Sequence, residues 1–333
     1  MKRCLCALAV LACLTLMTPD AARADELVIY SGRSKSLVKP VIDKFQSETG
    51  IRVKVRYGST AQMAAALQEE GDQSPADLFW AQDAGALGAA ASAGLFQKLP
   101  ETISSHVPEK FRNGSGLWVA TSARARVLAY SPTRVNKSEM PESVFDLTDP
   151  KYKGRVGWAP GNGSFQLFVT AMRKSHGEQK TEQWLREMKA NGAKPYAKNR
   201  PILHAIANGE VDLGLPNHYY LMRFKKADPG FPVEQTFFKS SDPGNLVMVA
   251  GIGQLKGSQN TEEARKFVDY VLSSKAQSYF TGDVFEYPMS PSIKPNGKLV
   301  SLSELEARAP KVRFDELDDL KGTLKLLREV GLQ

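Results

Sequence analysis

The feature that most constrains this chain is the alternation of short apolar runs with amphipathic segments along its first part. Residues 27–30 form a β-prone run, residues 37–45 repeat apolar side chains at helical spacing, and residues 51–57 alternate apolar with basic side chains. Residues 61–70 have a helical composition, and residues 76–80 form another short apolar run. This strand, helix, strand order predicts a mixed, mostly parallel sheet flanked by helices, which is an α/β fold.

The rest of the chain repeats this rhythm without repeating the sequence. Strand-like and helical segments alternate again between residues 155 and 224. Residues 118–130 and 245–255 are unusually long β-prone segments, so we expect both to cross between two lobes as hinge strands. We further expect one amphipathic helix over residues 262–279 and a mostly helical tail over residues 302–330.

The N-terminus has the anatomy of a secretory leader. Lys2 and Arg3 precede a mostly apolar stretch over residues 5–17, which is followed by Ala22, Arg23 and Ala24. This predicts a signal peptide cleaved after Ala24 and a periplasmic protein. An alternative is lipoprotein processing at Cys13, because residues 10–13 loosely resemble a lipobox.

Removal of 24 of the 333 residues would leave 309, more than one hydrophobic core usually supports. We therefore expect a first lobe of residues 25–123 and 247–285, and a second lobe of residues 124–246 and 286–333.

Composition excludes several classes of site. All three cysteines lie in the expected leader, so the mature chain has neither disulfides nor thiolate metal ligands. The formal charge of +8 is spread along the chain with acidic residues between the basic ones. Nucleic-acid binding would require a clustered basic stripe, so no nucleic acid is expected as a partner.

The ends of the first three predicted strands mark the expected ligand cleft. In parallel sheets, ligands bind beyond the carboxyl ends of the strands. Those ends are residues 31–34, 58–60 and 81–83.

Tyr219 and Tyr220 are the strongest candidates for chemistry, because they are adjacent and directly follow a strand-to-helix turn. Both rings can approach one point near a helix end, where the helix dipole also favours negative charge. A phenol has a pKa of about 10, so forming phenolate at neutral pH needs help, which a cation and a helix N-terminus both provide. The plainer interpretation is ordinary packing, with Tyr220 against Phe224 one helical turn away.

The chain also resembles the periplasmic ferric-ion-binding proteins, the bacterial transferrin-like branch of the binding proteins of ABC importers. The resemblance extends over nearly all of the mature chain. It is carried by residues 28–33, 69–79, 195–199, 209–212, 217–220, 242–244 and 286–288.

This resemblance implies a two-lobed, type II-like periplasmic-binding-protein fold. It implies that Tyr219 and Tyr220 bind Fe(III) as phenolates, and that the protein is a monomer which delivers its cargo to the membrane permease and ATPase subunits of an ABC importer.

The chain departs from the family where some members supply a histidine and a glutamate as further ligands. Those positions are Ser34 and Gln82 here, with Asp83 next. We expect these three residues to lie around the bound ion, and carbonate or a similar synergistic anion, or water, to complete the shell.

Candidate anion contacts follow from local chemistry and from the resemblance. Gly163 and Ser164 open a predicted helix, where backbone N–H groups favour anions. The resemblance adds Asn199 and Asn217. Two arginines are suited to bidentate contacts, namely Arg33 and Arg124, although a salt bridge is an equal alternative for each.

An enzyme is not expected. Residues 36–39 match the Ser-x-x-Lys pattern of serine acyl-enzymes, but the partner motifs are missing. The alternative function is a binding protein for a phosphorylated, phosphonate-type or other small organic anion. A structural or chaperone-like periplasmic protein is a third possibility, which would bind no ligand.

Overall fold

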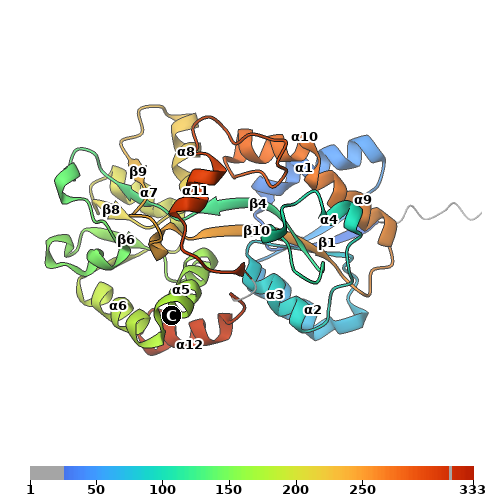
Figure 1. Cartoon of the computed structure of the whole chain (residues 1–333), viewed down its shortest axis with the longest axis horizontal. Helices are drawn as coiled ribbons and strands as arrows, with labels where there is room; N and C mark the ends of the chain where they lie inside the picture. The colour runs from blue at the N-terminus through green and yellow to red at the C-terminus, as the bar shows by residue number, and fades with distance from the viewer. Residues whose placement is uncertain (1–25, 315–316) are drawn as a thin grey trace, which may run out of the picture.

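A computed structural model describes residues 26–314 and 317–333 (Figure 1). The expected signal peptide, its cleavage point and Cys13 lie outside these ranges. The described residues form two five-stranded sheets side by side, as predicted. Within the described ranges, no helix combines the length and the apolar character needed to span a bilayer.

The first sheet has the strand order β2-β1-β3-β10-β4. Its bounds are β1 Leu27–Ser31, β2 Val53–Tyr57, β3 Leu78–Ala81, β10 Val247–Gln254 and β4 Val119–Ala125. β1 is parallel to both β2 and β3, whereas β10 is antiparallel to both β3 and β4. The sheet is parallel where strands alternate with helices, and antiparallel where the chain returns from the other lobe.

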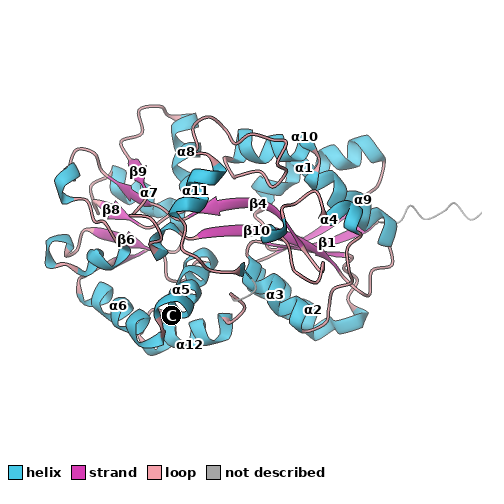
Figure 2. Ribbon diagram, in the orientation of Figure 1, coloured by secondary structure: helices cyan, strands magenta, loops and turns pink. Residues whose placement is uncertain are grey.

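Helices cover both faces of this sheet, as Figure 2 shows. They are α1 Lys35–Thr49, α2 Thr60–Glu70, α3 Ala84–Ser92, α4 Glu101–Ser104 and α9 Thr261–Leu272. Local signals set their ends: Gly50 closes α1 with a positive φ of 74°, and Ser59 forms a capping box with Gln62 at the start of α2.

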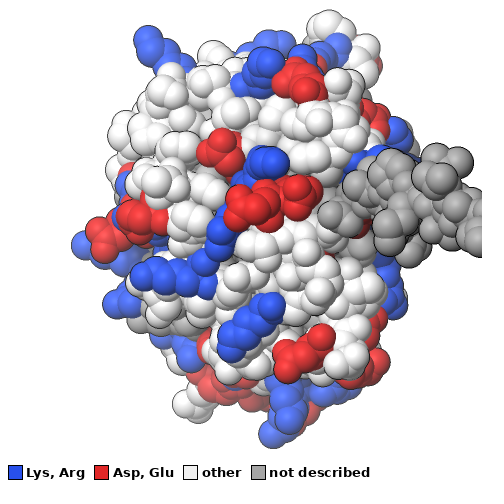
Figure 3. All heavy atoms as spheres, turned by 90° about the vertical axis from the view of Figure 1, so that its right-hand side faces the viewer, with Lys and Arg blue, Asp and Glu red and all other residues white. Residues whose placement is uncertain are grey.

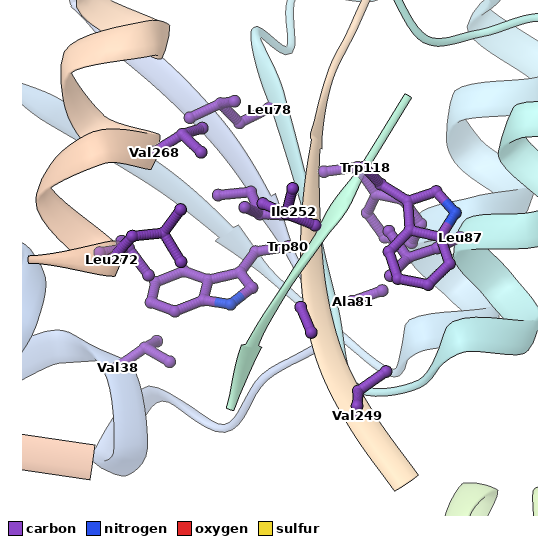
Figure 4. Packing of buried hydrophobic residues seen from close by; sticks show 14 of the residues in the cluster. Val38, Leu78, Trp80, Ala81, Leu87, Trp118, Val249, Ile252, Val268 and Leu272 are labelled. Atoms are coloured by element: carbon purple, nitrogen blue, oxygen red, sulfur yellow. The ribbon is translucent and has the colours of Figure 1, made fainter. Parts of the chain in front are cut away.

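Buried side chains from both faces make the core of this lobe (Figure 4). Trp80 packs beside Val38 and Leu272 on one side of the sheet, and Trp118 lies beside Leu87 on the other. The sheet is therefore fixed from both faces, which holds the ends of its strands in place.

The second sheet has the order β7-β6-β8-β5-β9. Its strands are short: β5 Leu128–Tyr130, β6 Val156–Trp158, β7 Lys194–Pro195, β8 Leu213–Gly214 and β9 Glu234–Thr236. β6 is parallel to β7 and β8, and β5 is antiparallel to β8 and β9. α5 Gly163–His176, α6 Glu178–Ala190 and α12 Leu320–Glu329 lie on one side, and α7 Asn199–Ala207 and α8 His218–Ala227 on the other (Figure 1).

The predicted crossing segments do join the lobes. Residues 118–130 form β4 of the first sheet and β5 of the second, and the strand is interrupted at Arg126 and Val127. β10 begins beside the second core, which Leu246 and Met248 enter, and continues as a strand of the first sheet.

One helix prediction needs correction. The helix predicted over residues 262–279 is broken into α9 and α10 Ser274–Tyr279, because the Ser273 side chain caps a new helix. The tail is mostly helical, as expected: it contains α11 Leu302–Arg308 and α12, and residues 309–313 after α11 are not helical.

The division of the tail between lobes differs from the expected boundary at residue 286. Tyr287, Met289 and Leu305 pack into the first core, whereas Leu326 and Leu327 pack into the second. The segment after residue 286 therefore serves both lobes.

Charges on the outer face of the first lobe are mixed (Figure 3). Exposed pairs such as Lys39 with Asp43 and Lys275 with Glu48 place opposite charges together. This arrangement agrees with the scattered charge of the sequence.

Candidate metal and anion site

A cavity of about 560 Å³ lies where the strand ends of the first lobe face the helix starts of the second. Gly32 allows a close approach on the first-lobe side, because an added Cβ would lie 2.3 Å from Thr60 Oγ1. The predicted site residues that line the cavity are Ser34, Gln82, Asp83, Gly163, Ser164, Asn217, Tyr219 and Tyr220. The other three, Arg33, Arg124 and Asn199, are buried behind its surface.

Tyr219 and Tyr220 occupy the first turn of α8, as expected. Their rings stack with centroids 4.3 Å apart at an interplanar angle of 29°. Tyr219 is buried, and burial, together with the nearby Tyr220 and Glu286, raises its pKa well above the usual value. The two phenols therefore form one adjacent pair of oxygen donors at a helix N-terminus.

His218, next to the pair, has both ring nitrogens occupied. Its Nδ1 accepts a hydrogen bond from the Ala125 N–H at 3.0 Å, so Nε2 carries the proton and donates to the Phe285 carbonyl at 2.7 Å. Burial lowers the pKa of His218 to about 4, which keeps the ring neutral. This histidine joins the start of α8 to β4 and to the segment after α10, which is a structural role.

Arg33 lies in a fully buried ion pair. It donates to Glu286 Oε1 at 3.0 Å and to Glu286 Oε2 at 2.7 Å, and its Nη1 also donates to Gln82 Oε1 at 3.1 Å. The Ser122 hydroxyl donates to the same carboxylate at 2.5 Å. Burial alone would raise the pKa of Glu286, but the charge and hydrogen bonds of Arg33 hold it below its usual value. The alternatives for Arg33 were a contact to a bound anion and a salt bridge, and in this structure it forms the salt bridge.

Arg124 is different, because among the described residues no carboxylate pairs with it and two of its nitrogens, rather than the Nε alone as in Arg33, lack a partner. Its Nη2 donates to the Gln82 carbonyl at 2.5 Å, whereas Nε and Nη1 have no partner. Burial lowers the pKa of Arg124 from its usual value, and the charges of Glu286 and Tyr219 oppose that change. Two buried nitrogens of a cation thus remain free to donate beside the tyrosine pair.

Ser164 is the centre of a polar cluster at the start of α5. Its hydroxyl donates to Asn162 Oδ1 at 2.6 Å and accepts from the side-chain amides of Asn199 and Asn217, each at 3.3 Å. The structure therefore brings together the predicted anion residues 163, 164, 199 and 217. Arg126 also reaches Ser164 Oγ from behind, at 3.5 Å.

Arg126 is a buried cation that sequence reasoning missed. It donates to the Leu215 carbonyl, and its guanidinium lies over the rings of Phe165 and Phe168. Burial lowers the pKa of Arg126 to about 9. It adds positive charge behind the start of α5.

The first-lobe residues have separate roles. Ser34 is exposed and precedes α1, and Gln82 is partly exposed. Asp83 Oδ1 accepts from the Ala86 N–H at 3.1 Å and thereby caps α3, while burial raises the pKa of its carboxyl. Within the described ranges, no group of three or more His, Cys, Asp or Glu side chains is placed to hold a metal.

Glu286 was also missed as a site residue, although it lies in a segment that carries the family resemblance. Its partner Arg33 is 253 positions away, so no local pattern links the two. For Arg126, the only local signal was a second arginine two residues after Arg124, on the same face of an extended segment.

The comparisons with known proteins agree on one group. Residues 73–318 match the model of a family described as bacterial extracellular solute-binding protein. The chain is 35% identical to the major ferric iron-binding protein of Neisseria meningitidis serogroup B, over 97% of each chain. It is 33% identical to the Fe(3+)-binding periplasmic protein of Serratia marcescens, over 94% of this chain and 93% of that protein.

A solved structure agrees with these relatives. Iron-bound HitA from Pseudomonas aeruginosa superposes with a TM-score of 0.88 at 36% identity, over 92% of this chain and 99% of the other.

Proposed function

Because this chain belongs to the bacterial extracellular solute-binding protein family, we propose that it is the solute-binding component of an ABC importer and that its cargo is ferric iron. The observation that carries the proposal is the stacked pair of Tyr219 and Tyr220 in an interlobe cleft. Relatives of similar length whose names specify ferric iron support it.

In this proposal the two phenols bind iron as phenolates. Fe(III) is a small, hard cation that prefers anionic oxygen ligands. A phenol must lose its proton to bind as phenolate, so iron releases protons as it binds. The N-terminus of α8 and the buried Arg124 both favour negative charge on Tyr219.

The remaining coordination positions would be filled by an exogenous anion such as carbonate. Its contacts would be the Gly163 N–H at the start of α5, since the Ser164 and Phe165 N–H groups already donate to Asn162, and the amides of Asn199 and Asn217. Arg124 has two nitrogens, Nε and Nη1, free to donate to such an anion. Arg33 is proposed as a positioning residue, because Glu286 already uses two of its donors.

The proposal includes the route of the protein and its cargo. A signal peptide cleaved after Ala24 would direct the chain to the periplasm. There a monomer would close its lobes over the ion and dock on the permease, whose ATPase subunits drive transport. Binding and delivery, not catalysis, is the activity proposed.

The test is a visible absorption titration of the mature protein with ferric citrate in bicarbonate buffer. A saturating charge-transfer band is expected, and it should be lost in the Tyr219→Phe, Tyr220→Phe double variant. Tyr270→Phe is the control, since Tyr270 is partly buried in α9 and does not line the cleft.

Absence of the band in the wild-type protein would overturn the proposal. Stabilisation by a phosphorylated organic anion without iron would favour the alternative function instead.

A further inference from the structure

One wall of the proposed iron cleft is apolar. Leu320 and Leu324 line the cavity from α12, together with the buried Leu167 of α5. Both α12 leucines remain partly exposed. A ferric ion with small oxygen anions gains nothing from such a surface, whereas an apolar group would be removed from water there.

The helix that carries these leucines is firmly held. Leu326 and Leu327 of α12 are buried in the second core. The Thr323 hydroxyl lies 2.7 Å from that of Thr170 on α5, and Arg173 forms an ion pair of 2.9 Å with Asp319. Leu320 and Leu324 are four residues apart and so lie on one face of the helix. Their position in the cleft is therefore fixed by packing elsewhere along α12.

The cavity is also larger than iron and a small anion require. The four oxygen ligands that the tyrosines do not supply, at about 30 Å³ for each water-sized group, would take about 120 Å³ of the roughly 560 Å³ present. The lobes already touch beside this space: a Cβ on Gly85 of α3 would lie 2.5 Å from the Leu317 carbonyl oxygen. α12 and α3 lie on the same side of the two sheets (Figure 1). The spare volume thus persists where the lobes are in contact.

We propose that this cleft takes ferric iron as a complex with an organic chelator that carries an apolar group, and that Leu320 and Leu324 bind this group. The inference rests on the proposed function, in which Tyr219 and Tyr220 supply two ligands and leave the others to the chelator. Sites of this size commonly combine an apolar wall with a few placed polar groups, as this cavity does.

Two hydroxamates provide a matched pair of probes. Acetohydroxamate and benzohydroxamate present the same two oxygen donors to iron, but the first carries a methyl group and the second a phenyl ring. Calorimetric titration with their 1:1 ferric complexes should show about tenfold or tighter binding of the phenyl complex by the wild-type protein.

The Leu320→Gln, Leu324→Gln double variant should lose this preference while its affinity for iron with bicarbonate stays unchanged. Glutamine preserves length and helix propensity. Leu302→Gln on α11 is the control, because Leu302 is also partly exposed but does not line this cavity. It should keep the preference.

Three results would overturn the inference. Equal affinity of the wild-type protein for the two complexes would do so while leaving ferric binding intact. The double variant could also lose as much affinity for iron with bicarbonate as for the phenyl complex. That result would mean that the leucines hold the lobes together and do not bind the apolar group. Loss of iron binding in every form would overturn the proposed function as well.

Discussion

The buried arginines around the cleft differ in how their charge is balanced. Arg33 has a carboxylate partner in Glu286, whereas Arg126 has a backbone carbonyl and two aromatic faces. A buried ion is costly when its partner is removed, because the remaining charge stays out of water. At the residue scale, the pair of Arg33 and Glu286 should therefore be among the most sensitive in the molecule.

Glu286→Gln should lower the free energy of unfolding at pH 7 by about 3 kcal/mol, because Arg33 would lose its charged partner in the interior. Urea unfolding of the iron-free protein measures this. The matched control is Glu182→Gln, which affects a solvent-exposed pair with Arg186 on α6 and should change stability by less than about 1 kcal/mol. Equal losses of stability in the two variants would contradict the conclusion that the buried pair of Arg33 and Glu286 is more sensitive than an exposed pair.

At the scale of elements, short strands in the second sheet depend on side-chain ties at their ends. Asp212, just before β8, accepts from Arg134 Nε and from Arg155 Nε, each at 2.6 Å. Arg134 follows β5 and Arg155 precedes β6, so one carboxylate joins three strands. Burial would raise the pKa of Asp212, but the hydrogen bonds and charges of the two arginines hold it below its usual value.

Asp212→Asn should therefore lower the free energy of unfolding by about 2 kcal/mol at pH 7. This difference in stability from the wild-type protein should shrink as the pH falls. The sign follows from the lowered pKa: the carboxylate stabilises the fold above its ordinary pKa of about 4, and this contribution is lost as the folded protein is protonated. Urea unfolding at pH 7 and at pH 3.5 tests this.

Asp43→Asn is the control, because Asp43 pairs with Lys39 on the exposed face of α1. It should have little effect at either pH. A cost for Asp212→Asn that is constant with pH would show that the charge of Asp212 does not contribute.

For the whole molecule, the relation of the lobes depends on a contact between α3 and the tail. Gly85 and Gly88 both lie on α3. Gly85 faces the Leu317 carbonyl oxygen, and Gly88 faces the Asp318 side chain. The tail segment belongs to the second core through Leu317, and α3 belongs to the first. The absence of a side chain at Gly85 thus allows the lobes to meet on this side of the cleft.

Gly85→Ala should force the tail away from α3, since its Cβ would lie 2.5 Å from a backbone oxygen. We expect a loss of about 2 kcal/mol in stability and a larger radius of gyration in small-angle X-ray scattering. Gly88→Ala, whose Cβ would make an ordinary 3.4 Å contact, should be neutral or stabilising by up to about 1 kcal/mol. If the two variants gave identical scattering, the contact between Gly85 and Leu317 would not determine how the lobes are positioned.

Local sequence patterns predicted much of this protein. Apolar periodicity located most strands and helices because it reports which face of each segment is buried. The start of α8 at His218, and with it the position of Tyr219 and Tyr220 on the first turn, follows from a strand-to-helix turn that is visible in the chain. The long segment 118–130 was predicted to cross between lobes, and it does.

Only the tertiary structure decided which partners the buried and half-buried groups have. Arg33 could have contacted an anion or a carboxylate, and the fold brings it to Glu286 from the far end of the chain. Leu320 and Leu324 have the spacing of ordinary core residues, yet packing of α12 on α5 leaves them facing the cleft. The physical reason is that periodicity records the need for burial or pairing, whereas the partner is set by contacts between segments distant in sequence.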